Sequence, residues 1–169
     1  MAASPSRISL PGGLRLVPAD RPAALRAAIC CILLACLIAV VADRIALSAL
    51  PASYADFYNA PLWPRTLMTS LQSMREELVY RLGLQTLLAA LPLLVRRQSG
   101  AAWMIGAIIL AQLANAGHWA FAVPPWGMVR FWLVGCIWGW LYWRHGFVTA
   151  LLAHGASHLL LDPLLLAII

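Results

Sequence analysis

The chain has 169 residues, of which 63% are hydrophobic and only 11% are charged, and its mean hydropathy is +0.82. A soluble domain carries about 25% charged residues, so this composition excludes a water-soluble globular protein. The formal charge of +6 comes from arginines, since the chain has no lysine. These arginines are scattered between apolar runs rather than clustered on one face, which argues against nucleic acid as a partner.

The length limits the number of membrane crossings. A bilayer core of about 30 Å requires roughly 20 apolar residues per helix, so the chain has room for five or six spans. We expect an all-α fold, a polytopic membrane helix bundle of about five transmembrane helices, with the lipid bilayer around it. Residues 1–23, rich in proline, glycine and arginine, are predicted to be a flexible cytoplasmic tail, and residues 24–169 a single transmembrane domain.

Apolar runs and turn residues predict the helices in chain order. The first run, 24–41, is interpreted as an uncleaved signal anchor because it is long and Asp43 and Arg44 follow it. After a polar connection with interfacial aromatic residues, apolar positions at three- and four-residue spacing predict a helix over 65–95. Further helices are predicted over 101–123, 128–143 and 147–169. The four cysteines lie inside apolar runs and are interpreted as packing residues.

The distribution of arginine predicts the orientation in the membrane. Cytoplasmic segments are enriched in basic residues. With the N-terminus in the cytoplasm, the inside segments hold Arg7, Arg15, Arg21, Arg26, Arg96, Arg97 and Arg144, and the outside segments hold Arg44, Arg65, Arg75 and Arg130. This excess predicts a cytoplasmic N-terminus and an external C-terminus.

Several ionisable residues fall inside the predicted spans. Such residues cost about 2.5 to 3.5 kcal/mol each on insertion scales, so they indicate function by default. The second helix carries Glu76, Glu77 and Arg81, the third carries His118, and the fifth carries His154 and His158. At about 1.5 Å per residue, these positions converge on the outer half of the membrane in the predicted orientation. The sequence therefore predicts one polar site shared by three helices.

The spacing within each helix predicts how these groups are arranged. Glu77 and Arg81 are four residues apart, where an acid that precedes a base forms a favourable pair. Glu76 lies about 100° around the helix from Glu77, so it remains available for chemistry. His154 and His158 are also four apart and share one face of their helix.

The order of these residues resembles the motifs of the CPBP family, the CAAX prenyl protease and bacteriocin-processing intramembrane endopeptidases. The segment Glu76-Glu77-Leu78-Val79-Tyr80-Arg81 is similar to the family's EExxxR motif. The segments 141–146 (LYWRHG) and 153–158 (AHGASH) are similar to its last motif, and His118 to its middle motif, FxxxH. The resemblance covers residues 76–162 and implies a catalytic core over 66–169.

The resemblance implies a role for each matched residue. Glu76 and His118 would activate a water molecule, His154 and His158 would stabilise the oxyanion, and Glu77 and Arg81 would support the site. No metal and no other cofactor is implied. The chain departs from the family pattern at Ala114, where an aromatic residue is usual, and at His158, where asparagine or aspartate is usual. The second departure leaves open whether His158 donates to the oxyanion, titrates or binds a metal.

A small five-span member with an outward-facing site also resembles the sorting branch of the family, the myxosortases. That resemblance implies an integral protein of a bacterial inner membrane, with its site toward the outer leaflet. It further implies a membrane-anchored protein or peptide substrate that carries a short motif, a transmembrane helix and a basic end.

Two other functions compete with a glutamate peptidase. The first is a zinc-dependent membrane hydrolase, in which His118, His154, His158 and Glu76 would bind the metal. A HExxH pattern is absent from the sequence, and the EExxxR spacing has no role in that scheme. The second is a non-catalytic membrane protein that uses the polar pocket to bind a helix or a small ligand.

Overall fold

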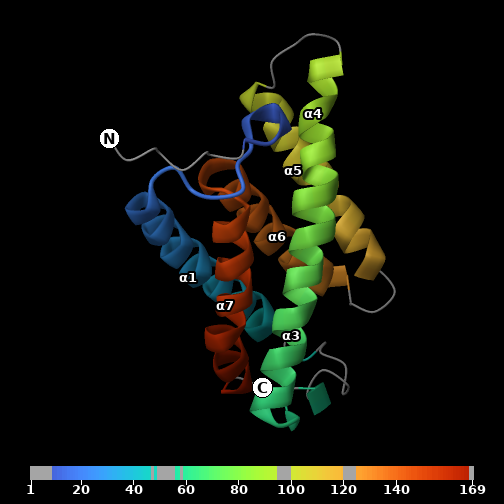
Figure 1. Ribbon diagram of the computed structural model, residues 1–169. Coiled ribbons are helices and arrows are strands. Elements are labelled where there is room, and N and C mark those ends of the chain that lie inside the picture. The colour runs from blue at the N-terminus through green and yellow to red at the C-terminus, as the bar shows by residue number, and fades with distance from the viewer. Residues whose placement is uncertain are drawn as a thin grey trace.

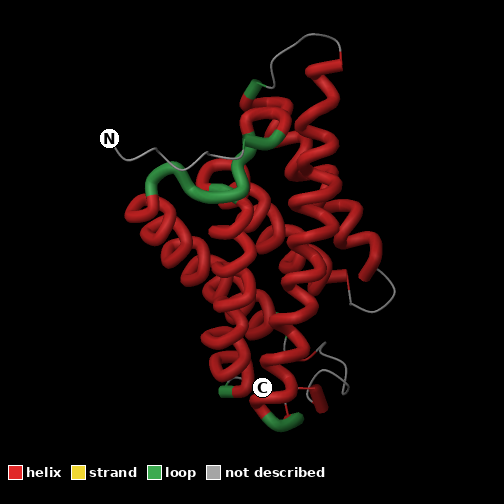
Figure 2. Tube along the Cα trace, viewed as in Figure 1, coloured by secondary structure: helices red, strands yellow, loops and turns green. Residues whose placement is uncertain are grey.

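The computed structural model describes residues 9–46, 48, 56–57, 59–94, 100–119 and 125–167. The named elements in this part of the chain are all helical, and the only bridge between extended residues joins Ser9 to Arg15. They are η1 (Pro11–Gly13), α1 (Arg21–Ile45), α3 (Leu62–Glu76), η3 (Glu77–Gln85), α4 (Thr86–Leu94), α5 (Ala101–Trp119), α6 (Pro125–His145) and α7 (Phe147–Leu166). This arrangement confirms the predicted all-α membrane helix bundle (Figures 1 and 2).

Within the described residues, four helical segments are long and apolar enough to cross a membrane: Arg21–Ile45, Leu62–Leu94, Ala101–His118 and Phe147–Leu166. α6, predicted as a further span over 128–143, is a helix of 21 residues but is not among these four. α6 is less apolar than these four segments because it carries Arg130 and several tryptophans. The tryptophan rings have a polar nitrogen and favour the membrane interface. α6 nevertheless packs against α1, α5 and α7 inside the bundle.

The second predicted helix is one continuous rod over Leu62–Leu94, close to the predicted range of 65–95. Figure 1 shows it running the height of the bundle as α3 and α4. Its middle part, Glu77–Gln85, is a π-helix, a wider form that often marks functional sites. The Thr86 hydroxyl donates to the carbonyl of Arg81, five residues earlier, at 3.2 Å. The wide turn thus coincides with the segment that carries the second glutamate and the arginine.

Two glycines bring the backbone of α6 close to its neighbours. Gly135 and Gly139 are four residues apart, a spacing at which small residues let membrane helices approach. The carbonyl of Gly135 accepts from Arg81 at 2.8 Å, and that of Gly139 accepts from Gln85 at 3.0 Å. A Cβ atom at Gly135 would overlap the side chain of Gln112. A side chain at position 135 would therefore displace Gln112 from its contacts with Arg81 and Phe131.

α1 begins at a capped end and is tied to α6 near its other end. The carboxylate of Asp20 accepts from the N–H of Ala23 at 3.0 Å, which satisfies one of the free donors of the first turn. Near the end of the helix, Asp43 is fully buried and pairs with Arg130 at 2.5 Å. α1 packs against α6 and α7. It therefore forms a wall of the bundle.

The segment before α1 is packed against the bundle from residue 9 onward, in contrast to the flexible tail expected over 1–23. Leu14 is fully buried, and η1 contacts α4. The carbonyls of Arg15 and Leu16 accept from the N–H groups of Phe147 and Val148, each at 2.9 Å. These bonds satisfy two donors that the first turn of α7 would otherwise leave unpaired. Residues 1–8 of the expected tail, and Arg96 and Arg97, lie outside the described residues.

Candidate active site

The candidate site is a cavity of about 330 Å³ within the bundle. It lies in the half of the bundle where α1 and α7 end and α3 and α6 begin, opposite the segment 9–19 (Figure 1). Its walls are largely apolar, with contributions from Cys36, Phe131, Val134, Trp138 and Leu161. The polar lining side chains are Thr69, Gln72, Ser73, Glu76, Arg81, Gln112, Arg130, His154, Ser157 and His158.

Glu76 is the last residue of α3, and its side chain lines the cavity while only 5% of the residue is exposed. One carboxylate oxygen, Oε1, accepts from the side-chain amide of Gln72 at 3.0 Å. The other, Oε2, accepts from the amide of Asn115 on α5 at 3.2 Å. Both partners are neutral, so they fix the direction of the carboxylate without neutralising its charge.

Glu77 is fully buried and is absent from the lining of the cavity. Its Oε1 lies 2.9 Å from Nδ1 of His154 and 3.8 Å from Nε of Arg81. The predicted pair with Arg81 is therefore present, but the shorter contact is with His154. Because an ionised carboxylate can only accept a hydrogen bond, Nδ1 of His154 carries the proton in this pair. Nε2 is then the nitrogen of His154 that remains for a substrate.

Arg81 joins three helices at the centre of the bundle. The residue is 1% exposed, and its Nη2 donates to the side chain of Gln112 at 2.5 Å and to the carbonyl of Gly135 at 2.8 Å. A buried arginine is tolerated in a span only when acceptors compensate it, and here they come from α5, α6 and Glu77. Arg81 consequently stabilises the wall behind Glu76 as well as the pair with Glu77.

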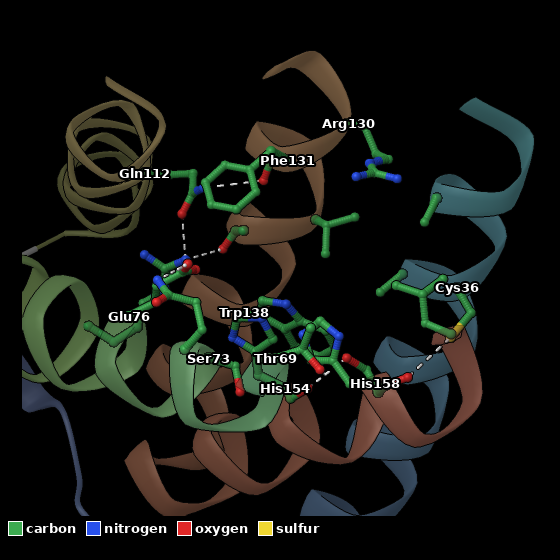
Figure 3. Close-up of a pocket in the computed structure, with 18 of the residues that line it drawn as sticks. Cys36, Thr69, Ser73, Glu76, Gln112, Arg130, Phe131, Trp138, His154 and His158 are labelled. Carbon is green, nitrogen blue, oxygen red and sulfur yellow. Dashed lines mark hydrogen bonds between the residues drawn. The ribbon is translucent and has the colours of Figure 1, made fainter. Parts of the chain in front are cut away.

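The two histidines of α7 lie in one stack with a tryptophan of α6. The ring of Trp138 packs on His154 with centroids 5.1 Å apart and an angle of 18° between the planes. The His154 ring lies 5.7 Å from that of His158, at 28°. Figure 3 shows this stack in the middle of the cavity, with Glu76 on one side and Cys36 on the other. The predicted common face of His154 and His158 therefore faces the cavity.

His118 lies elsewhere in the structure. It is exposed at the end of α5, and its Nε2 is 3.0 Å from Nη2 of Arg75, on the neighbouring helix α3. It does not line the cavity that Glu76, His154 and His158 share. Asn115, one helical turn before His118, reaches Glu76 instead. The structure thus brings together three of the four predicted catalytic residues, with the supporting Glu77 and Arg81 behind them.

Several polar residues at the site were not predicted, and three of them contact the predicted acidic or histidine side chains: Gln72, Asn115 and Asp162. Gln72 and Asn115 hold Glu76, and Asp162 lies four residues after His158. Asn115 and Asp162 are polar residues among apolar neighbours in predicted spans, which is the signal that could have identified them. Gln72 lies in a polar stretch of its helix, and only its position one turn before Glu76 indicates its contact. Among the described residues, no group of three histidine, cysteine, aspartate or glutamate side chains is arranged to hold a metal ion.

Comparison with known proteins identifies the family. A model of the family described as type II CAAX prenyl endopeptidase Rce1-like matches residues 58–160, well over half of the chain. Comparisons with curated proteins and with solved structures gave no match. The matched segment contains Glu76, Glu77, Arg81, His118, His154 and His158. The resemblance to the CPBP endopeptidases is thereby confirmed, and this integral membrane protein belongs to the Rce1-like family of CAAX endopeptidases.

Proposed function

We propose that this protein hydrolyses a peptide bond of a membrane-anchored protein, with Glu76 as the general base. The observation that carries the proposal is that a buried carboxylate and two imidazoles line the same cavity inside a membrane bundle. A carboxylate in a poorly hydrated site is a suitable base, and imidazoles are suitable partners for an oxygen that gains negative charge. The cavity needs no covalent nucleophile for this reaction.

The reaction balances with one water molecule and one carboxylate. Glu76 takes a proton from water while the water oxygen forms a bond to the carbonyl carbon of the scissile peptide. The π-electrons of the carbonyl move to its oxygen, which becomes an oxyanion near His154 and His158. When the intermediate collapses, the C–N bond breaks and Glu76 returns the proton to the departing amine. The products are a new carboxylate terminus and a free amine.

Glu77 supports the reaction through His154. With Nδ1 donating to Glu77, His154 presents Nε2 to the cavity. A proton on Nε2 makes the ring an imidazolium, whose charge the buried carboxylate of Glu77 compensates. A charged donor forms a stronger hydrogen bond to an oxyanion than a neutral one. Glu77 is thus proposed as a positioning residue, and Arg81 as the residue that keeps Glu77 and the helices around it in place.

The orientation of the proposed base, Glu76, depends on Asn115 more than on His118. The family resemblance gives His118 as the second water-activating residue, but His118 contacts Arg75 rather than Glu76. Asn115 contacts Glu76 directly and fixes the direction of its carboxylate. We therefore expect Asn115 to orient the base, and His118 to act indirectly through Arg75, the neighbour of Glu76.

The proposed substrates are proteins with a C-terminal tail of a short motif, a transmembrane helix and a basic end, as in the sorting branch of the family. In the orientation predicted from the arginines, with the N-terminus in the cytoplasm, the half of the bundle that contains the cavity faces outward. A tail that crosses the membrane emerges on that side. Its cleavage site would then meet Glu76 at the outer leaflet.

Mass spectrometry of membrane-anchored proteins tests the reaction and names the substrate. Cells with the parent chain, without it, and with Glu76→Gln would be compared. We expect tails that are removed only in cells with the parent chain. A set of anchored proteins that is identical in all three strains would contradict the proposal. Purified protein offered a farnesylated peptide with a CAAX end, and separately a transmembrane tail peptide, would distinguish the two kinds of substrate.

Cysteine labelling in intact cells tests the orientation. Single cysteines at Ser4 and at Arg97 would be introduced into a chain whose four native cysteines are replaced by alanine. We expect a membrane-impermeant maleimide to label neither until the cells are opened. Labelling of both positions in intact cells would place the N-terminus outside and reverse the proposed side of the cavity.

A further inference from the structure

His158 stands where the family pattern has asparagine or aspartate, and its ring has a carboxylate partner on the same helix. Nδ1 of His158 lies 3.5 Å from Oδ1 of Asp162, one turn later on α7. Asp162 is 1% exposed, so its carboxylate is almost completely buried inside the protein. His158 itself lines the cavity. Because Nδ1 is turned toward Asp162, Nε2 is the nitrogen of His158 that a bound substrate can reach.

Two side chains of α3 fix the other oxygen of Asp162. The hydroxyl of Thr66 donates to Oδ2 at 3.1 Å, and Nε of Arg65 lies 3.6 Å from the same atom. Both residues are buried. With Oδ2 occupied by α3, Oδ1 is the oxygen that remains for His158. The carboxylate therefore has a defined orientation, with one oxygen toward α3 and one toward the imidazole.

A related arrangement occurs one turn earlier in the stack. Oε1 of Glu77 lies 2.9 Å from Nδ1 of His154, a hydrogen bond. Oδ1 of Asp162 instead faces Nδ1 of His158 across 3.5 Å, an ion-pair contact in which neither buried atom has another hydrogen-bond partner among the described residues. The two rings pack on each other. In each pair the carboxylate lies behind the ring and is absent from the cavity lining, while the ring is part of it. The two neighbouring imidazoles thus each have a buried carboxylate of their own.

We infer that Asp162, oriented by Thr66 and Arg65, is a positioning residue that keeps the proton of His158 on Nδ1 and aims Nε2 at the reacting carbonyl oxygen. The form of His158 that donates from Nε2 while Nδ1 keeps its proton is the imidazolium, and Asp162 compensates its charge. The second proton is on the ring before the water attacks and stays there, so the transfer between water, Glu76 and the amine is unchanged. An asparagine at position 158 would donate through its amide without this support. The inference rests on the proposed function, because it assigns His158 to the oxyanion of that reaction.

A purely structural role is the alternative, because Asp162 also links α7 to α3. A double-mutant cycle separates the two roles, since residues that act through one another give non-additive effects. The variants are Asp162→Asn, His158→Asn and the combination, assayed with the farnesylated CAAX peptide and the transmembrane tail peptide. Asp43→Asn is the matched control, because Asp43 is equally buried and links α1 to α6 through Arg130.

We expect Asp162→Asn to lower kcat about tenfold in the parent and less than about twofold in the His158→Asn background, a coupling typical of residues in contact. Asp43→Asn should change kcat by the same factor in both backgrounds. An equal loss from Asp162→Asn in both backgrounds would reduce Asp162 to a structural link and overturn the inference.

A spectroscopic measurement tests the pair without any assay of cleavage. Nitrogen NMR of the protein with labelled histidine reports which ring nitrogen carries the proton, and the spectrum of His158→Asn identifies the signals of His158. In Asp162→Asn, Thr66 and Arg65 hold the new carbonyl oxygen, so the amide NH₂ faces His158. We therefore expect the neutral ring of His158 to carry its proton on Nδ1 in the parent and on Nε2 in Asp162→Asn.

The two measurements also distinguish failure of the inference from failure of the proposed function. A protein that cleaves neither peptide but shows the proton shift retains the pair and contradicts the peptidase reaction. A protein that cleaves but shows the same tautomer of His158 in the parent and in Asp162→Asn retains the reaction and contradicts the role of Asp162.

Discussion

Glu76 and Glu77 are adjacent in sequence but have opposite surroundings. Glu76 lines the cavity and has two neutral amides as partners. Glu77 is fully buried, is absent from the lining, and lies against an imidazole and a guanidinium. The boundary between α3 and the π-helix η3 falls between the two residues. One step along the backbone therefore separates a carboxylate that can meet a substrate from one that meets only protein.

The difference indicates which carboxylate can act as a base. A base must exchange a proton with a reacting group within hydrogen-bond distance, so it needs access to the cavity. A carboxylate fixed between a histidine and an arginine is suited to orientation and charge compensation. The proposed division of the pair follows from these contacts rather than from the residue type, which is the same.

The largest expected effect comes from Glu76→Gln. The amide keeps the size of the side chain but cannot take a proton from water, so cleavage should fall by a factor on the order of 10³. Turnover of the farnesylated CAAX peptide or of the identified tail would measure the loss. The melting temperature should change little, because Gln72 and Asn115 can rotate their amides to suit the new side chain. Parental turnover in this variant would eliminate Glu76 as the base.

The next effect concerns the residue at the oxyanion. His158→Ala removes the donor and should lower kcat by about a hundredfold or more. His158→Asn keeps an N–H and should retain most of the parental kcat. Both variants would be compared at equal folded amounts, measured by size-exclusion chromatography in detergent. If His158→Asn is as inactive as His158→Ala and bound zinc disappears with both, the position is a metal ligand and the proposed mechanism fails.

Removal of the Glu77 carboxylate, which contacts only protein, should affect folding more than removal of the Glu76 carboxylate, which lines the cavity. Glu77→Ala leaves Arg81 without its ion partner inside the bundle, a change that costs about 3 kcal/mol or more. We expect a lower yield of folded protein and a lower melting temperature in detergent. Arg81→Ala should behave similarly, because Glu77 then remains as an uncompensated buried charge. A melting temperature equal to that of Glu76→Gln would show that the two carboxylates are not as different as the structure indicates.

Much of the fold followed from the sequence because apolar periodicity determines membrane helices. The ends of the second helix were predicted within about three residues of the observed Leu62–Leu94. The π-helix at Glu77–Gln85 was not predicted, since no periodicity distinguishes it from an α-helix over nine residues. The approach of α6 through Gly135 and Gly139 was missed as well, although the four-residue spacing was visible. The packing of residues 9–20 depends on backbone bonds to α7, which the local composition does not encode.

The site was predicted in part for a similar reason. Spacing along one helix placed His154 and His158 on one face, and family motifs identified Glu76 and Glu77. Contacts between helices were harder to predict from the sequence, because they depend on how each helix is rotated about its axis. The rotation of α5 directs Asn115 toward Glu76 and His118 toward Arg75. The place of Asp162 in the site was not predicted, because its contact with Thr66 joins residues 96 positions apart in the sequence.

The smallest expected effect tests that rotation of α5. Asn115→Ala removes the amide that fixes Oε2 of Glu76, so the carboxylate gains freedom and kcat should fall by about tenfold, an effect of the size found when an orienting contact is lost. His118→Ala removes a contact to the exposed Arg75, away from the cavity lining, and should lower kcat less than about threefold, within the range of a minor neighbouring contact. Combined with Glu76→Gln, Asn115→Ala should have no further effect, because it acts through that carboxylate. A loss near 10³ in His118→Ala, with Asn115→Ala close to the parent, would mean that α5 rotates by about 60° and shifts by about 4.5 Å along its axis when substrate binds, the helical separation of the two residues. His118 would then stand beside Glu76 as the second water-activating group.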